Sequence, residues 1–196
     1  EQAMNVARTA LLIAGFPIHV PGVTIDRQCG SSQQAVHFAA QAIASGDMDI
    51  VIAGGVESMT RAPMFKNVGE TKPSKRLTKQ HKIVNQGISA ELIANKWGFS
   101  RRQLDEYAYQ SHQLALSAIE KGHYADEIVP IKVTDENGEG KIVDVDEGPR
   151  PETTIDILSE LQPVFKKGGK ITAGNSSQMS DGASAVLLMS KEKADE

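Results

Sequence analysis

The sequence predicts an α/β fold with a second, α+β domain inserted into the first. A strand, a helix and a strand follow one another within residues 23–55, an order typical of an α/β sheet. Another continuous apolar strand, residues 183–189, comes only after a long, more polar stretch. We therefore expect residues 1–58 and 180–196 to form one α/β domain, and residues 59–179 to form the insertion.

Alternating helix and strand patterns define the first domain. Apolar residues recur at helical spacing over residues 2–14 and again over residues 31–45, where Gly46 ends an alanine-rich helix with almost no charge. A helix of that composition is usually buried. Residues 23–25 are a strand candidate, and residues 49–55 form an apolar run typical of a strand buried on both faces.

The insertion begins with a basic stretch, residues 60–86, which we expect to be a loop. Residues 87–97 have helical spacing. Ser100 and Gln103 then form a capping box, which predicts a long helix running to about Lys121.

The rest of the insertion contains shorter elements. Residues 128–145 read as a hairpin that turns at Asn137-Gly138. A short helix is predicted over residues 156–161, and residues 171–177 have the composition of a glycine-bearing loop.

The composition of the chain argues against several classes of function. The chain has 196 residues, 40% hydrophobic and 23% charged, with a net charge of −4, which is ordinary for a soluble globular protein and gives no reason to expect nucleic-acid or membrane partners. A single cysteine excludes an internal disulfide, and no Cys/His cluster has zinc spacing.

We expect a cytoplasmic location. Both ends fall inside predicted helices and no initiator Met is present, so we expect a piece of a longer protein.

Cys29 is the main candidate for chemistry. It stands two residues before Ser31, where a helix is predicted to begin, and Gly30 allows a sharp turn beside the sulfur. A helix N-terminus favours the nucleophilic thiolate. Free cysteines are also common as inert core residues, so spacing alone leaves both interpretations open. His37, the nearest histidine, would stand about 12 Å away along one helix, so no catalytic partner is visible for a Cys-His protease.

Two glycine loops and one basic run carry weaker signals. Residues 53–59 lack the spacings of nucleotide-binding motifs and favour a close backbone approach at the end of a strand. Residues 172–182 offer Asn175, Ser176 and Ser177 in a row, suited either to an extended polar ligand or to a plain turn. The basic run, residues 66–82, could meet phosphates or simply face solvent.

Three stretches in order carry a family resemblance. They read VPGVTIDRQCGSSQQAVHFAAQAIASGDMDIVIAGGVESMTRAPM, NQGISAELIANKWGFSRRQLDEYAYQSH and ITAGNSSQMSDGASAVLLMS. Together they resemble the thiolases, the family of acetyl-CoA acetyltransferases and 3-oxoacyl-CoA thiolases. The resemblance covers essentially the whole chain and implies a partial, layered α/β N-terminal domain whose inserted loop domain covers coenzyme A.

The resemblance also implies roles for individual residues. Cys29 would be the nucleophile that becomes acylated. Arg150 would contact the adenine and ribose of coenzyme A, Phe165 would pack on its pantetheine, and Ala173 and Ser177 would meet the pantetheine amides. Coenzyme A and acyl-CoA would be substrates, with no tightly bound cofactor and no metal, and the protein would be a homodimer or homotetramer.

Two departures from the family pattern matter. Short-chain biosynthetic members tend to have His-Met where this chain has Asn85-Gln86, which leaves room for longer or branched acyl chains. The Asn-Glu-Ala, Gly-His-Pro and Cys-Gly-Gly-Gly motifs of the C-terminal half are missing, and Gly122-His123-Tyr124 is no substitute. We therefore expect this chain alone to be inactive. A ketoacyl-synthase-type condensing enzyme and a non-catalytic acyl-CoA-binding module are the alternatives.

Overall fold

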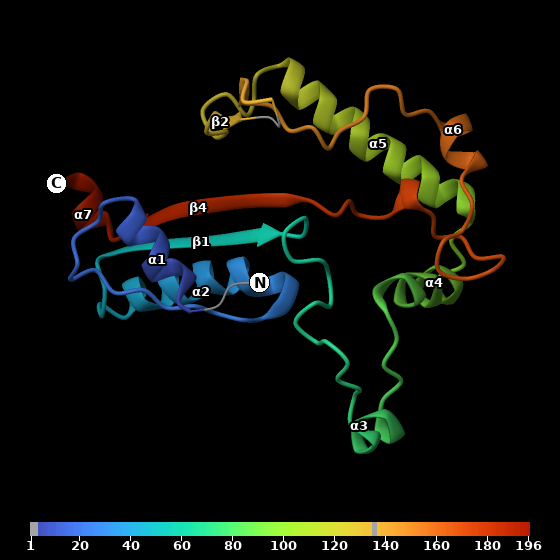
Figure 1. Cartoon of the computed structure of the whole chain (residues 1–196), viewed down its shortest axis with the longest axis horizontal. Coiled ribbons are helices and arrows are strands. Elements are labelled where there is room, and N and C mark those ends of the chain that lie inside the picture. The colour runs from blue at the N-terminus through green and yellow to red at the C-terminus, as the bar shows by residue number, and fades with distance from the viewer. Residues whose placement is uncertain (1–3, 135–136) are drawn as a thin grey trace. The chain divides into compact units, whose positions relative to one another are not determined.

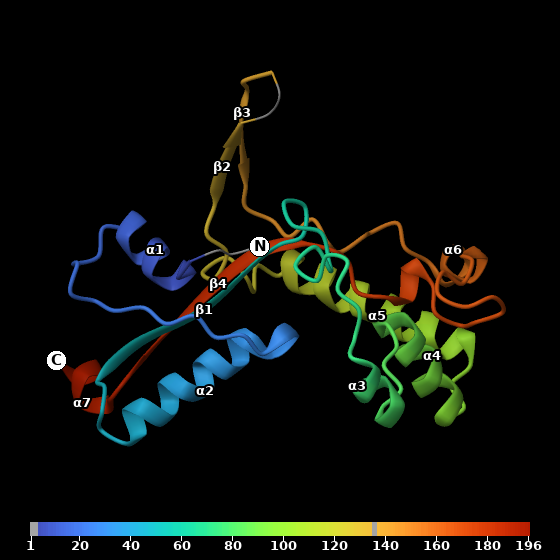
Figure 2. The ribbon, with the colours of Figure 1, turned by 60° about the horizontal axis from the view of Figure 1, so that its bottom comes forward.

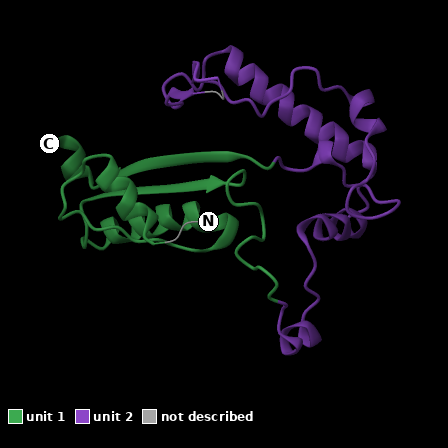
Figure 3. Ribbon diagram, in the orientation of Figure 1, with its two compact units in different colours: residues 1–71, 179–196 green, residues 72–178 purple. Residues whose placement is uncertain are grey.

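The computed structural model describes residues 4–134 and 137–196. Its contacts divide the chain into two compact units, one made of residues up to 71 together with 179–196, and one made of residues 72–178 (Figure 3). The division into domains at residues 59 and 179 stays a prediction. The ends of two predicted elements, residues 2–3 of the first helix and residues 135–136 of the hairpin, lie outside the described residues.

The first unit pairs two strands and covers them with a helix. Its elements are α1 (Val6–Ile13), the 3₁₀ turn η1 (Gln28–Gly30), α2 (Ser31–Ala44), β1 (Ile50–Ser58), β4 (Asp181–Met189) and α7 (Lys191–Asp195) (Figure 1). β1 and β4 run antiparallel, from Ile50 opposite Met189 to Ser58 opposite Asp181. α2 packs along one face of this sheet (Figure 2). Thus the two strands are far apart in the sequence, as the nested plan predicts, but adjacent in the fold.

Burial in this unit is lower than the sequence predicts. β1 was expected to be buried on both faces, yet within it only Ala53 is buried, and Ile52 is 46% exposed. Likewise, only Ala39 of α2 is buried. The physical reason is that, in the described part of the chain, the sheet has two strands and one covering helix, which is too little protein to enclose both faces.

The strand expected over residues 23–25 is wrong. This segment hydrogen-bonds to the start of α1 instead of joining the sheet. The Asn5 side chain caps α1, its Nδ2 donates to the carbonyl of Gly22 at 2.6 Å, and its Oδ1 accepts from the Thr24 hydroxyl at 3.3 Å. The hydrogen bond from Asn5 satisfies the carbonyl of Gly22 without the pairing of a neighbouring strand.

The second unit is mainly helical. Its elements are α3 (Lys75–Gln80), α4 (Gln86–Lys96), α5 (Arg101–Glu120), β2 (Ile131–Thr134), β3 (Gly140–Val143), α6 (Ile155–Glu160) and the 3₁₀ turn η2 (Ala173–Asn175). The capping box at Ser100 and Gln103 is confirmed, as are the hairpin strands, which pair antiparallel. The basic stretch is not wholly a loop, because Ser74 caps α3 through its side chain. No described helix has the length and apolar character needed to span a bilayer.

Candidate functional site

Cys29 lies in η1, directly before α2, and its side chain is exposed. The turn is fixed from both sides. The Ser31 hydroxyl accepts from the backbone N–H of Arg27 at 2.9 Å and donates to the carbonyl of Gln28 at 2.7 Å. Asp26 accepts the N–H of Gln28 at 3.0 Å. The backbone that presents the sulfur is therefore held by hydrogen bonds on either side of it.

Gln28 has a backbone φ of 51°, in the left-handed region that a non-glycine residue rarely adopts. Such strain persists only where the surroundings determine the conformation, and it concentrates at functional sites. The next residue is Cys29, so this unusual conformation lies directly before the backbone that carries the thiol.

The N-terminus of α2 has no side-chain cap. The amides of a first helical turn carry partial positive charge, so an uncapped helix start favours a neighbouring thiolate or another anion. Cys29 thus has an exposed side chain, a backbone fixed by hydrogen bonds on either side of it, and a helix N-terminus directly after it.

The close backbone approach predicted for residues 53–59 is confirmed, but it lies inside β1 and not at the end of a strand, because β1 continues through both glycines to Ser58. A Cβ on Gly54 would stand 2.7 Å from the carbonyl oxygen of Ser184 in β4. A Cβ on Gly55 would collide with Ser32 at the start of α2. The two glycines thus allow the helix that follows Cys29 to pack onto the sheet.

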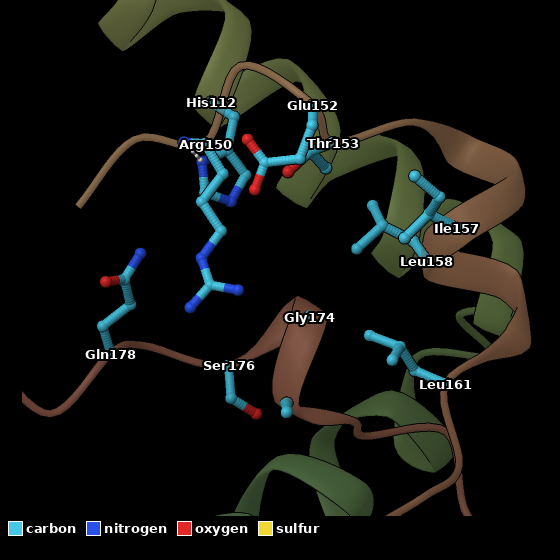
Figure 4. Close-up of a pocket in the computed structure, with 11 residues that line it drawn as sticks. His112, Arg150, Glu152, Thr153, Ile157, Leu158, Leu161, Gly174, Ser176 and Gln178 are labelled. Atoms are coloured by element: carbon cyan, nitrogen blue, oxygen red, sulfur yellow. Dashed lines mark hydrogen bonds between the residues drawn. The ribbon is translucent and has the colours of Figure 1, made fainter. Parts of the chain in front are cut away.

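The second unit contains a cavity of about 240 Å³. It is lined by a mixture of apolar and polar side chains from α5, α6, η2 and the connecting segments: His112, Arg150, Glu152, Thr153, Ile157, Leu158, Leu161, Ala173, Gly174, Ser176 and Gln178 (Figure 4). Of the residues that the resemblance assigned to coenzyme A, Arg150 and Ala173 meet here. Phe165 and Ser177 are outside this lining.

Two long-range hydrogen bonds hold the segment that carries Arg150. The backbone N–H of Arg150 donates to Nδ1 of His112 on α5 at 3.1 Å, and Nε2 of Gln178 donates to the carbonyl of Gly148 at 2.6 Å. In Figure 4 the guanidinium of Arg150 points into the cavity. One wall of the cavity is thus a cationic group on an anchored loop.

A buried polar network supports the opposite wall. Nδ2 of Asn175 donates to Asp105 at 2.9 Å and to the carbonyl of Lys170 at 3.0 Å, and Oδ1 of Asn175 accepts the N–H of Thr172 at 2.8 Å. Asp105 is 1% exposed and also pairs with Arg101 at 2.8 Å. Arg101 in turn donates to the carbonyl of Leu158 in α6. The network fastens η2 and α6 to α5.

Glu91 anchors the segment that leads into η2. Its Oε1 accepts the backbone N–H groups of Lys170 and Ile171, at 2.7 and 2.8 Å. Phe165, on the same segment, packs against α4 so closely that a Cβ on Gly87 would stand 2.1 Å from the ring. The position of Phe165 is therefore set by a glycine.

Sequence reasoning missed Glu91, Asp105 and His112. In α4 the buried residues are Gly87, Glu91 and Ala94, so Glu91 lies on a face of small residues. That spacing was a detectable signal, because a lone acid between small residues on one helix face marks a close approach by another segment. No comparable pattern in the sequence singles out Asp105 or His112.

A family model described as "Thiolase, N-terminal domain" matches residues 1–192. The chain belongs to the thiolase family. The predicted resemblance is thereby confirmed.

Individual thiolases are similar along the whole chain. It is 45% identical to a 3-ketoacyl-CoA thiolase of Bacillus subtilis, with 100% of this chain and 52% of that protein covered. It is 47% identical to a steroid 3-ketoacyl-CoA thiolase of Mycobacterium tuberculosis, with 97% and 48% covered. The crystal structure of the Bacillus anthracis acetyl-CoA acetyltransferase superposes with a TM-score of 0.83 at 40% identity, covering 97% of this chain and 51% of that one. These thiolase matches confirm the predicted fold class, and the chain spans about half the length of the relatives it matches.

Within the described residues, no group of three or more His, Cys, Asp or Glu side chains could hold a metal ion. Cys29 belongs to one compact unit of this thiolase chain, and the cavity belongs to the other. The chain therefore carries two separate features, an exposed thiol and a mixed polar and apolar cavity.

Proposed function

We propose that the full-length protein is a thiolase in which Cys29 is the acyl-accepting nucleophile. The observation that carries this proposal is the exposed Cys29 on a fixed turn before the uncapped start of α2. The thiolase model over residues 1–192 supports it. The names of similar proteins, 3-ketoacyl-CoA thiolase and acetyl-CoA acetyltransferase, agree with the same chemistry.

The reaction has two covalent steps. The Cys29 thiolate attacks the carbonyl carbon of an acyl thioester, and an oxyanion forms that backbone N–H donors stabilise. The tetrahedral intermediate collapses by releasing either the thiolate of coenzyme A or the enolate of acetyl-CoA, each of which takes up a proton. The acyl group then passes from sulfur to coenzyme A in degradation, or to the α-carbon of acetyl-CoA in synthesis.

The cavity of the second unit is proposed to receive coenzyme A. The Arg150 guanidinium suits the polar adenosine end, and the apolar side chains of Ile157 and Leu158 suit its adenine or pantetheine. Phe165 would pack on the pantetheine, and Ala173 and Ser177 would meet its amides. The exposure of Phe165, Ala173 and Ser177 leaves all three accessible to such a ligand.

We further propose longer or branched acyl groups as substrates. Asn85, at the position where short-chain members tend to have histidine, caps α4 by accepting the N–H of Ile88 at 2.9 Å. The Asn85 side chain therefore has a structural role as the N-cap of α4. A cytoplasmic homodimer or homotetramer, without nucleic-acid or membrane partners, completes the proposal. The 196-residue chain alone would be inactive.

Intact-protein mass spectrometry tests the proposal. The full-length protein is incubated with acetyl-CoA or a 3-oxoacyl-CoA, and we expect a mass increase of one acyl group that maps to Cys29. The Cys29→Ala variant must lose this adduct while keeping its fold and its affinity for coenzyme A. A wild-type protein that binds coenzyme A but forms no adduct would indicate a non-catalytic acyl-CoA-binding module instead.

A further inference from the structure

His112 makes the hydrogen bond that fixes Arg150 beside the cavity. Its Nδ1 lies 3.1 Å from the backbone nitrogen of Arg150, 38 residues later in the chain (Figure 4). His112 is carried by the long helix α5, which is tied to η2 and α6 through Asp105 and Arg101. The imidazole therefore joins the connecting segment that carries Arg150 to the helix that is tied to η2 and α6.

The direction of this hydrogen bond determines the protonation state of His112. A backbone N–H can only donate, so Nδ1 must be an acceptor and must carry no proton. The single proton of the neutral ring then lies on Nε2. If the ring gains a second proton, Nδ1 becomes a donor that faces another donor, and the bond is lost.

The charges around His112 come from few elements. Arg150 and Glu152 are the charged side chains that line the cavity with it, and both belong to the segment that His112 anchors. From α6 and from residues 173–178, the lining side chains are uncharged. The charged groups that line the cavity with His112 are therefore one cation and one carboxylate.

We propose that His112 is a positioning residue for coenzyme A, and that the acceptor Nδ1 of its ring holds Arg150 in place. The inference rests on the proposed function, because it takes coenzyme A as the ligand of this cavity. Affinity for coenzyme A should therefore fall when this acceptor is removed, by the value of one neutral hydrogen bond, or about 2- to 10-fold.

A matched pair of variants isolates the hydrogen bond. His112→Asn places a carbonyl oxygen close to the former Nδ1 and does not titrate, whereas His112→Leu has the same branched shape and no acceptor. Coenzyme A binding to the full-length protein is measured by calorimetry at pH 7.5. We expect the wild type to match His112→Asn, and His112→Leu to bind about 2- to 10-fold more weakly than both.

A second measurement does not depend on the ligand. Long-range ¹H–¹⁵N correlation spectra of the histidine ring assign its tautomer, and we expect a proton on Nε2 and none on Nδ1 at pH 7.5. A proton on Nδ1, or equal coenzyme A affinities of His112→Asn and His112→Leu, would overturn the role of His112. Failure of every variant to bind coenzyme A while the Nε2 tautomer is observed would instead remove the ligand assigned under the proposed function, and with it the positioning role.

Discussion

Gly55 of β1 and Ser32 of α2 pack so closely that a Cβ on Gly55 would stand 1.8 Å from the hydroxyl oxygen of Ser32 and 2.9 Å from its Cβ. Both distances are below any real contact, so a new rotamer of Ser32 would not relieve the collision. Because Ser32 is three residues after Cys29, the packing of this glycine also sets the position of the thiol.

Gly55→Ala should therefore damage both stability and acylation. Overpacking of this kind costs about 1–3 kcal/mol, and the start of α2 must shift away from the sheet. We expect the rate of acylation at Cys29 to fall by more than the loss of folded protein explains. Urea unfolding and single-turnover mass spectrometry measure the two effects. Gly182→Ala is the matched control, because it lies in the paired strand β4 with nothing within 4 Å of the added Cβ, and it should change neither quantity.

Gly87→Ala should displace the ring of Phe165. A Cβ at this position would stand 2.1 Å from the ring, so the variant should lose about 1–3 kcal/mol of unfolding free energy. Phe165→Ala should lose stability by a separate route, through the removal of ring contacts. The double variant tests whether the two residues are coupled, since it should be more stable than the sum of the single losses predicts. Strict additivity in urea unfolding would contradict the contact.

Glu91→Ala should be among the most destabilising substitutions of the second unit. It leaves the N–H groups of Lys170 and Ile171 without their acceptor, at about 1–3 kcal/mol for each buried group. Glu91→Gln keeps one acceptor oxygen and should lose less. Glu106→Ala is the surface control, because its bond to Arg102 is exposed to water, and it should remain within about 0.5 kcal/mol of the wild type. Comparable losses for Glu91→Ala and Glu106→Ala would show that Glu91 is no anchor.

Local signals in the sequence predicted most of the elements. The Ser100 and Gln103 capping box fixed the start of α5, and the apolar runs located β1 and β4, because caps and periodicity act within a few residues. Long-range events were harder to predict. The segment around Val23 has strand composition, but its neighbours Gly22 and Thr24 are hydrogen-bonded to the side chain of Asn5. No pattern in the sequence indicates that partner.

In the candidate site, too, local features could be predicted from the sequence and long-range contacts could not. Cys29 could be found from one cysteine, one glycine and a helix start, all adjacent in the chain. Its proposed role came from the long resemblance, since spacing alone also fitted an inert residue. His112 and Asp105 were missed because their hydrogen-bond partners, Arg150 and Asn175, are 38 and 70 residues away in the sequence.

Asp181 should make the first unit sensitive to acid. Its carboxylate accepts the N–H of Thr60 at 2.9 Å, and this hydrogen bond holds the pKa of Asp181 below its usual value. A lowered pKa in the folded state stabilises the fold above the unfolded-state pKa, near 3.9, and that contribution is lost as the pH falls through the folded-state value. The stability difference between the wild type and Asp181→Asn should be constant above about pH 5 and should shrink below about pH 4. A difference that stays constant down to pH 3 in urea titrations would refute the linkage.

Asn175→Asp should destabilise the second unit in a way that depends on pH. The new carboxylate oxygen replaces the Nδ2 donor and faces two acceptors, Asp105 at 2.9 Å and the carbonyl of Lys170 at 3.0 Å. Two hydrogen bonds become repulsive contacts, which costs about 3 kcal/mol or more at neutral pH. Below about pH 5 one of the two carboxyl groups can take up a proton and donate to the other, so part of this loss should be recovered.

Asn175→Ala separates repulsion from the loss of hydrogen bonds. It removes the same donor without adding a charge, so its deficit should be smaller than that of Asn175→Asp at pH 7 and should change less, relative to the wild type, as the pH falls. Urea unfolding of the three proteins at pH 7 and pH 4.5 measures both trends. If Asn175→Asp and Asn175→Ala follow the same pH dependence, Asp105 does not face residue 175 as a carboxylate, and the network that ties η2 to α5 has another basis.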